Sequence, residues 1–580
     1  SIQVQGANVT LTDDSVMLIQ NQGLQPAGNL SVHASESLQL LDPMPSGAIN
    51  SGIFNETVGI GNGGDIEVIT QRLVVQDGAS IQARTFSTAT GGNITVNASK
   101  SAQVVGFSPL NSTAFSSIST SALNSGGVGK LIVSTERLTV LDGGAVISTT
   151  FGAGNAGDVI VKATESIEVS GAEPSLLVPS LIASTTLYNG LDQEKGNAGN
   201  VRIDTRQLLV RDGGRVDSST LASGNAGSVI INASESVKVS GRFPGSVNPS
   251  LIISSANIVD PVLRKALGLP DQPSGDSGNV TINTPHLSVT DGAQVTVRND
   301  GTGKAGTLTI NADSILLNNQ GGITASTNAG ESAQEGSITL NVRNSLQMRH
   351  NSVISADARG QQRGGNITIN AGAIAAVPKE NSDITASAPQ GTGGKITINT
   401  QGIFGTQFRP NLTPESDITA FGDPTKAQSN GIVQVNTPEI NVQAALNQLN
   451  GNFITTEQAI ASSCFARRNV EQGTFTVTGT GGLPTTPYDA IGGRYAVTQV
   501  QGLPNSARQQ TSSPTPNPVS PPAQSWKLGD PIQEAQGMSV TPDGRIIVGT
   551  NPQLAAIADP QTLICHLTIR PKAESRGQKG

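Results

Sequence analysis

The chain has 580 residues and a net charge of −8, with 67 glycines but only 3% aromatic and 13% charged residues. The acidic balance and the lack of a basic run exclude a nucleic-acid-binding surface, which needs clustered Lys and Arg. No apolar stretch approaches the roughly 20 residues of a membrane-spanning helix, so we expect no transmembrane segment. A chain this long forms several domains or one elongated array.

A short glycine-led segment, of which Gly92 to Ala98 is an example, recurs along the chain with apolar residues two and four positions after the glycine. The copies begin at Gly28, Gly64, Gly92, Gly129, Gly157, Gly199, Gly227, Gly278, Gly306, Gly336, Gly365, Gly394 and Gly431. This alternation predicts a strand with one buried face, which must stack on its own copies. Disorder is the competing interpretation of a polar, Gly-rich chain. A disordered chain, however, has no reason to keep apolar residues at the same two positions after each glycine.

Several of these glycines lie 28 residues apart, and the interval that begins at Gly64 shows the content of one coil. A second strand carries Leu73 and Val75, and an Asp77-Gly78 turn suited to positive φ follows it. A third strand places Ile81 inward. The sequence therefore predicts an all-β array of stacked coils, with three strands and about 28 residues per coil.

Asparagine recurs five positions after the glycine in many coils, which predicts a ladder of stacked amides along the array. The residues at this position are Asn97, Asn232, Asn283, Asn311, Asn341, Asn370, Asn399 and Asn436.

Alternate coils carry insertions directly after Gly106, Gly171 and Gly241, so we expect the inserted loops to project from the same edges of the stack. Loops on a rigid scaffold often make functional contacts, whereas the alternative is that they are only tolerated surface insertions. The candidate partner-binding residues are Phe107, Pro109, Leu176, Leu177, Phe243 and Pro244. A further insertion, residues 260–269, has helical character.

The repeat ends near Gly431, and four segments are expected: a repeat domain at 1–445, a cap with a short helix and β segment at 446–511, a Pro-rich linker at 512–525, and a small terminal β unit at 526–580. In the last unit a Pro542-Asp543-Gly544 turn precedes a strand. Cys464 and Cys565 are the only cysteines, and we expect them to form a disulfide between the cap and the terminal unit, although two free thiols are equally compatible with the sequence.

No motif predicts a catalytic, cofactor or metal site. Gly275-Asp276-Ser277-Gly278 has the letters of a serine protease nucleophile but leads into a repeat strand without a triad context. Gly59 to Gly64 satisfies GxGxxG, yet a strand follows where dinucleotide binding needs a helix. The histidines, among them His286, show no metal-ligand spacing. The nearest approach to an acid-base set is Lys162, Arg202 and Asp204 on neighbouring strands.

Two features together resemble a known family. The coil pattern GGNITV followed by LxVxDGAxI is similar to the exoprotein repeats of filamentous haemagglutinin-like proteins, particularly the large cyanobacterial members. Phe475 to Pro484 resembles the FxVTGxGGLP segment that follows those repeats, and Glu534-Ala535-Gln536-Gly537 resembles the terminal EAQGW element, with Met538 in place of the aromatic residue.

The resemblance implies a right-handed, single-stranded parallel β-helix exported by two-partner secretion through a dedicated outer-membrane transporter. It implies a secreted or cell-surface filamentous adhesin without catalysis, whose partner is an extracellular receptor, matrix or glycan. Ser1 to Val4 already look like part of a coil and form no signal peptide, so we expect the natural chain to start further upstream, with the secretion domain of the family missing from the present sequence. The alternatives are a β-helix polysaccharide lyase or hydrolase and a purely structural sheath protein.

Overall fold

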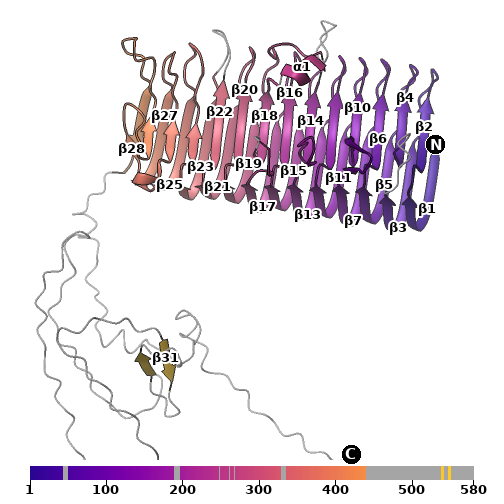
Figure 1. Cartoon of the computed structure of the whole chain (residues 1–580), viewed down its shortest axis with the longest axis horizontal. Coiled ribbons are helices and arrows are strands. Elements are labelled where there is room, and N and C mark those ends of the chain that lie inside the picture. Colours follow the sequence, from indigo (N-terminus) through magenta and orange to yellow (C-terminus); the bar gives the residue numbers. More distant parts are fainter. Residues whose placement is uncertain are drawn as a thin grey trace, which may run out of the picture. The chain divides into compact units, whose positions relative to one another are not determined.

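Two long parallel β-sheets form the repeat region in the computed structural model of the protein (Figure 1). The structure describes residues 1–42, 50–187, 196–246, 249–259, 261–266, 268–327, 335–438, 537–540 and 546–549. Each sheet has 14 strands, and neighbouring strands in a sheet come from successive coils, except for β28 and β29, which pair within one coil. The predicted parallel β-helix, or β-solenoid, is therefore confirmed.

The first sheet contains the long strands, most of which have 10 to 12 residues. They are β1 (Ile2–Leu11), β3 (Leu30–Leu40), β5 (Ile66–Gln76), β7 (Ile94–Val105), β11 (Leu131–Leu141), β13 (Val159–Ser170), β15 (Val201–Arg211), β17 (Val229–Ser240), β19 (Val280–Thr290), β21 (Thr307–Asn318), β23 (Ser337–Met348), β25 (Asn366–Ala376), β27 (Lys395–Phe404) and β30 (Ile432–Asn436).

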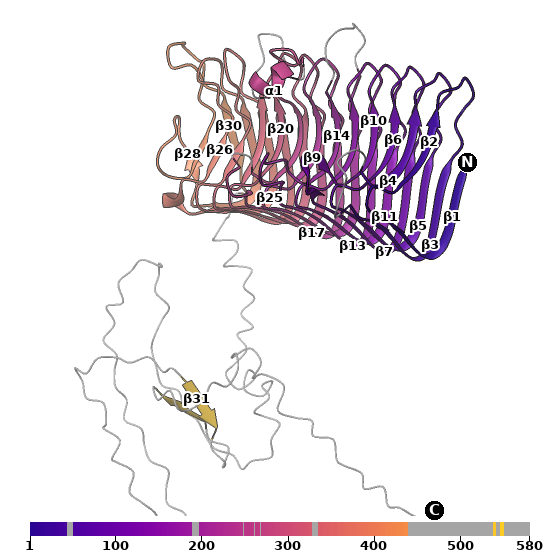
Figure 2. The same cartoon turned by 45° about the vertical axis from the view of Figure 1, so that its right-hand side comes forward.

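The second sheet contains shorter strands. They are β2 (Val16–Asn21), β4 (Gly52–Thr57), β6 (Ser80–Thr85), β10 (Ser117–Ala122), β12 (Ala145–Thr150), β14 (Leu181–Thr186), β16 (Arg215–Thr220), β18 (Leu251–Ala256), β20 (Gln294–Asn299), β22 (Gly322–Thr327), β24 (Val353–Ser355), β26 (Asp383–Thr385), β29 (Asp417–Thr419) and β28 (Gln407–Phe408). Figures 1 and 2 show the successive coils side by side along the repeat region.

Every predicted glycine-led strand is a strand of the first sheet, β3 to β30, and pairs in parallel with the strands of neighbouring coils. Ile66 of β5 lies opposite Ile94 of β7, and both side chains are buried. The inward row continues through every coil as one hydrophobic core from Leu11 to Ala420. At the usual strand spacing of about 4.8 Å, 14 strands span about 60 Å.

The first and second strands predicted for each coil form one continuous strand in the structure. The boundary between them is a local shift in register, as between Thr70 and Arg72 of β5. The Thr70 hydroxyl donates to the Arg72 carbonyl at 3.3 Å, and Thr135 does the same to Arg137 at 3.2 Å. Because the hydroxyl satisfies a carbonyl at the irregular position, the chain changes direction here without leaving the sheet.

The expected Asp-Gly turns have the backbone geometry that their sequence predicts. Asp77 and Gly78 have φ values of 58° and 89°, and Asp142 and Gly143 have 52° and 92°. The third predicted strands follow these turns, and Ile81 of β6 is fully buried. The helical character of 260–269 is also confirmed, because α1 spans Pro261–Ala266. The remaining short elements are β8 (Phe107–Ser108), β9 (Asn111–Phe115) and the 3-10 helix η1 (Pro378–Glu380).

The chain divides into two units, Ser1–Glu439 and Ile440–Gly580. In the second unit, β31 (Gly537–Val540) and β32 (Ile546–Gly549) form an antiparallel hairpin, with Val540 opposite Ile546. The strand predicted after the Pro542-Asp543-Gly544 turn is thus present. The expected cap, the Pro-rich linker, Cys464 and Cys565 lie outside the described residues. None of the helices in the described part of the chain has the length and hydrophobicity needed to span a membrane.

Candidate functional site

The three inserted loops leave the first sheet at equivalent positions. Val105, Ser170 and Ser240 are the last residues of β7, β13 and β17, and they are matched in register through Leu141 of β11 and Arg211 of β15. Since one loop-free coil separates each pair, the loops stand two strand spacings apart, about 10 Å. The expectation that they share an edge of the stack is confirmed.

A buried serine fixes the base of each loop. The Ser180 hydroxyl donates to the Ser170 carbonyl at 2.6 Å and accepts the Gly143 N–H at 3.0 Å. Ser250 makes the same two bonds, to the Ser240 carbonyl at 2.7 Å and from the Gly213 N–H at 2.9 Å.

Ser116 repeats this arrangement with the Val105 carbonyl and the Gly78 N–H. All three serines are fully buried. The serine ties the end of each loop to the end of its own strand and to the Asp-Gly turn of the preceding coil. Each loop is therefore held at its base by two neighbouring coils.

The loops themselves are small hairpins. In the first, β8 pairs antiparallel with β9, and Phe107 lies opposite Phe115. In the others, single antiparallel bridges join Ala172 to Pro179 and Arg242 to Pro249. In each loop the antiparallel pairing turns the backbone around, so the loop connects a first-sheet strand to the next second-sheet strand.

The carboxylate of Glu173 stabilises the backbone of the second loop by accepting hydrogen bonds from it. Its carboxylate accepts the Ser175 N–H at 2.9 Å, the Ser175 hydroxyl and the Leu176 N–H, while the residue is only 2% exposed. Burial acts to raise the pKa of Glu173, but these hydrogen bonds outweigh burial and lower it overall. The ionised carboxylate thus holds the backbone that carries Leu176 to the surface.

The predicted loop residues differ in exposure. Pro109, Leu176 and Pro244 are exposed, whereas Phe107, Leu177 and Phe243 are half-buried. Leu110, which sequence reasoning did not single out, is 66% exposed and Leu176 is 52% exposed. The apolar tips therefore form a row at one corner of three alternate coils.

The first loop also borders a cavity of about 450 Å³ on the outer face of the second sheet. Phe115 of the loop, Leu18 and Phe54 contribute to its lining. The Arg84 guanidinium lies 5.3 Å from the centroid of the Phe54 ring, within the range of a cation–π contact. This mixed surface was not predicted, because the outward positions of short strands carry no periodic signal.

A second candidate surface is an open groove on the outer face of the first sheet. Its largest part has a volume of about 720 Å³ and is lined by residues of five successive long strands, β19 to β27. Asn311, Asn341, Asn370 and Asn399 lie along it. Equivalent positions of the first coils line a cavity of about 510 Å³, and those of the last coils line one of about 430 Å³ that adjoins the largest part at Asn399. The groove follows the positions where the long strands shift register.

The predicted amide ladder runs along this groove. The Nδ2 atom of each asparagine donates to the Oδ1 atom of the equivalent asparagine in the preceding coil, at 2.7 to 2.9 Å. The ladder joins Asn232, Asn283, Asn311, Asn341, Asn370, Asn399 and Asn436. Asn97 occupies the same position but lies between Ile69 and Ser134, so it is not part of the ladder.

Asp204, the residue on which the enzyme alternative depends, is held in an ion pair. Arg202 donates to both of its carboxylate oxygens, at 2.9 and 3.0 Å, and Asn232 donates at 2.7 Å. Burial acts to raise the pKa of Asp204, but the hydrogen bonds and the charges of Arg202 and Lys162 lower it overall. Such a carboxylate remains ionised and engaged, which is typical of a structural pair.

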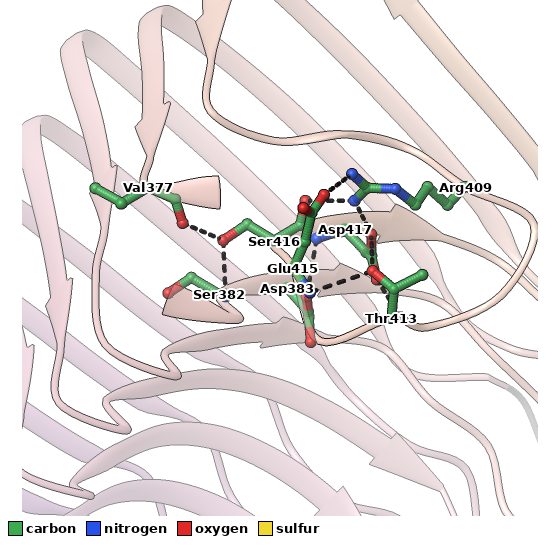
Figure 3. Close-up of polar contacts among 8 residues, drawn as sticks. All are labelled: Val377, Ser382, Asp383, Arg409, Thr413, Glu415, Ser416 and Asp417. Atoms are coloured by element: carbon green, nitrogen blue, oxygen red, sulfur yellow. Dashed lines mark hydrogen bonds and ion pairs between the residues drawn. The ribbon is translucent and has the colours of Figure 1, made fainter. Parts of the chain in front are cut away.

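The most buried charged cluster lies in the last coil (Figure 3). Asp417 is fully buried, and its carboxylate accepts hydrogen bonds from the Arg409 guanidinium and from the Thr413 N–H, the latter at 2.5 Å. Arg409 also pairs with Glu415, and the Asp417 N–H donates to Asp383 at 2.9 Å. Burial, together with the charge of Asp417, raises the pKa of Asp383. These contacts close the loop between β28 and β29.

The protease-like motif has structural contacts. The Ser277 hydroxyl donates to the Arg298 carbonyl at 2.7 Å, and His286 Nδ1 lies 2.9 Å from the Ser314 hydroxyl. The serine and the histidine are thus engaged with different residues. Within the described ranges, no three His, Cys, Asp or Glu side chains gather as metal ligands.

No known family model, curated protein or solved structure matches this chain. The resemblance to filamentous haemagglutinin-like exoproteins therefore depends on the sequence motifs alone.

Proposed function

We propose that the protein is a secreted or cell-surface adhesin, in which a rigid β-solenoid presents the three inserted loops to an extracellular receptor, matrix or glycan. The observation that carries the proposal is the row of loops in alternate coils, each fixed by a buried serine and each ending in exposed apolar residues. Exposed apolar side chains on ordered loops are common in binding surfaces. Export through an outer-membrane two-partner-secretion transporter is the part of the proposal that depends on the resemblance.

The second candidate function is a polysaccharide lyase or hydrolase, favoured by the proximity of Lys162, Arg202 and Asp204 on neighbouring strands. A general base needs a free carboxylate within reach of substrate. The two oxygens of Asp204 are instead engaged by Arg202 and Asn232. This arrangement favours the adhesin over the enzyme.

Adhesion tests the proposal directly. Microspheres coated with the full chain are expected to be retained on surfaces that carry matrix proteins or polysaccharides, and Pro109→Ser, Leu176→Ser and Pro244→Ser together are expected to reduce retention. The matched control changes Ile60 and Leu123 to Ser, since these exposed apolar residues lie outside the loops. Equal retention of the two variants would contradict the role of the loops.

The enzyme alternative has its own readout. Incubation of the chain with an acidic polysaccharide such as polygalacturonate is expected to release no reducing ends. Release that Asp204→Ala abolishes would overturn the adhesin proposal.

A further inference from the structure

We propose that the groove over the amide ladder binds a linear, uncharged polysaccharide, whose chain lies along the axis of the solenoid. This site goes beyond the adhesive loops, because it lies on the outer face of the first sheet and uses different residues. Its occupant is inferred from the hydrogen-bonding groups, the spacing and the charge of the groove.

The ladder leaves half of each amide available. An asparagine amide has two N–H donors and an oxygen with two lone pairs. The ladder uses one donor and one lone pair of Asn311, Asn341 and Asn370. The ladder partners fix the orientation of each amide, so the remaining donor and acceptor form an ordered row that suits ligands with many hydroxyl groups.

The spacing of the row matches an extended chain of sugars. Successive coils are about 4.8 Å apart, close to the length that one sugar unit adds to an extended β-linked glycan. Five strands line the largest part of the groove, so about five sugar units would span it, and four of these strands contribute a ladder asparagine to the lining. Ala312, Val342 and Ala371 also border it, but their side chains are buried in the hydrophobic core, so the contacts to the sugar come from the polar groups of the groove.

The charge of the groove favours a neutral ligand. Asp313 and Arg343 are the charged residues that line its largest part, and they pair with each other at 2.9 Å. A polyanion would find no unpaired cation among these residues, and a polycation would find no unpaired carboxylate. Neutral glycans need only the hydroxyl contacts that the amides supply.

The test uses the full chain and cello-oligosaccharides from the disaccharide to the hexasaccharide, with binding measured by calorimetry. Affinity is expected to rise with length and to level off at about five units. Asn341→Leu with Asn370→Leu is expected to reduce the affinity at least tenfold. Thr339→Val with Thr368→Val is the matched control, since these residues lie on the same strands but do not line the groove.

A second measurement leaves the ladder intact. Bound hexasaccharide is expected to protect Arg343 of the unaltered chain from phenylglyoxal, while Arg359, an exposed residue outside the groove, stays reactive. No binding of any oligosaccharide, equal loss in the control variant, or no protection of Arg343 would overturn the groove proposal. Loss of adhesion in the loop variant with unchanged oligosaccharide binding would separate the two sites.

Discussion

The Nδ2 atom of Asn232 lies 2.7 Å from the Oδ1 atom of Asp204, and this contact ends the amide ladder at a carboxylate. Every ladder amide donates toward the preceding coil, so Asn232, which has no asparagine before it, donates to a different acceptor. The ionised carboxylate of Asp204 is an acceptor that donates to no further residue, so the row of donated bonds ends there. Hydrogen bonds in a chain strengthen one another, so this end point supports the whole row.

The ladder is expected to contribute measurably to stability. Asn341→Leu removes its bonds to Asn311 and from Asn370, at about 0.5 to 1 kcal/mol each. The denaturant midpoint of the variant is expected to fall. Asn97→Leu is the matched control, because Ile69 and Ser134 flank that residue in place of amides. A larger fall of the denaturant midpoint in Asn97→Leu than in Asn341→Leu would contradict a stabilising contribution of the ladder.

The serines at the loop bases are expected to contribute more to the free energy of unfolding than serines on the outer face of a sheet. Ser180→Ala leaves the Gly143 N–H without its acceptor in a buried position, which costs about 1 to 3 kcal/mol. Limited proteolysis is expected to cut within residues 172–179 faster than in the unaltered chain. Ser288→Ala on the outer face of β19 is expected to change neither quantity, and equal effects would refute the specific role of Ser180.

Acid is expected to weaken the corner around Glu380. Arg349 donates to both carboxylate oxygens at 2.6 and 2.8 Å, and this pairing is the main reason that the pKa of Glu380 is lowered from 4.5 to about 2. Because the folded-state pKa is lowered, the stabilisation is complete above pH 4.5 and is lost as the pH falls toward 2.

Glu380→Gln is therefore expected to lower the melting temperature at neutral pH, with a difference from the unaltered chain that vanishes near pH 2. Arg349→Met is expected to show the same pH dependence. A difference that persists unchanged at low pH would show that the ionised pair is not its cause.

The ionised form of Asp383 is expected to destabilise the protein, in contrast to that of Glu380. The pKa of Asp383 is raised from 3.8, first by burial, so its ionised form costs stability above the folded-state pKa and costs none below 3.8. Asp383→Asn keeps an oxygen for the Asp417 N–H and is expected to raise the melting temperature at neutral pH, but not at pH 3. A lower melting temperature at neutral pH would contradict this expectation.

The repeat made most of the fold predictable. The glycine-led strands, the Asp-Gly turns and the common edge of the loops follow from periodicity, because each coil must align with its copies. The continuity of the first two strands was not predictable, since the bend is closed by individual hydrogen bonds such as that of Thr70. The roles of Glu173 and Ser180 also escaped prediction, because they depend on contacts between coils or within a single loop.

The single direction of the amide ladder has a consequence for recognition. All of its dipoles point the same way along the sheet, so the two ends of the groove differ electrostatically. A polysaccharide likewise has a reducing and a non-reducing end. A chain bound in the groove is therefore expected to adopt one polarity, with its reducing end always toward the same terminus of the protein.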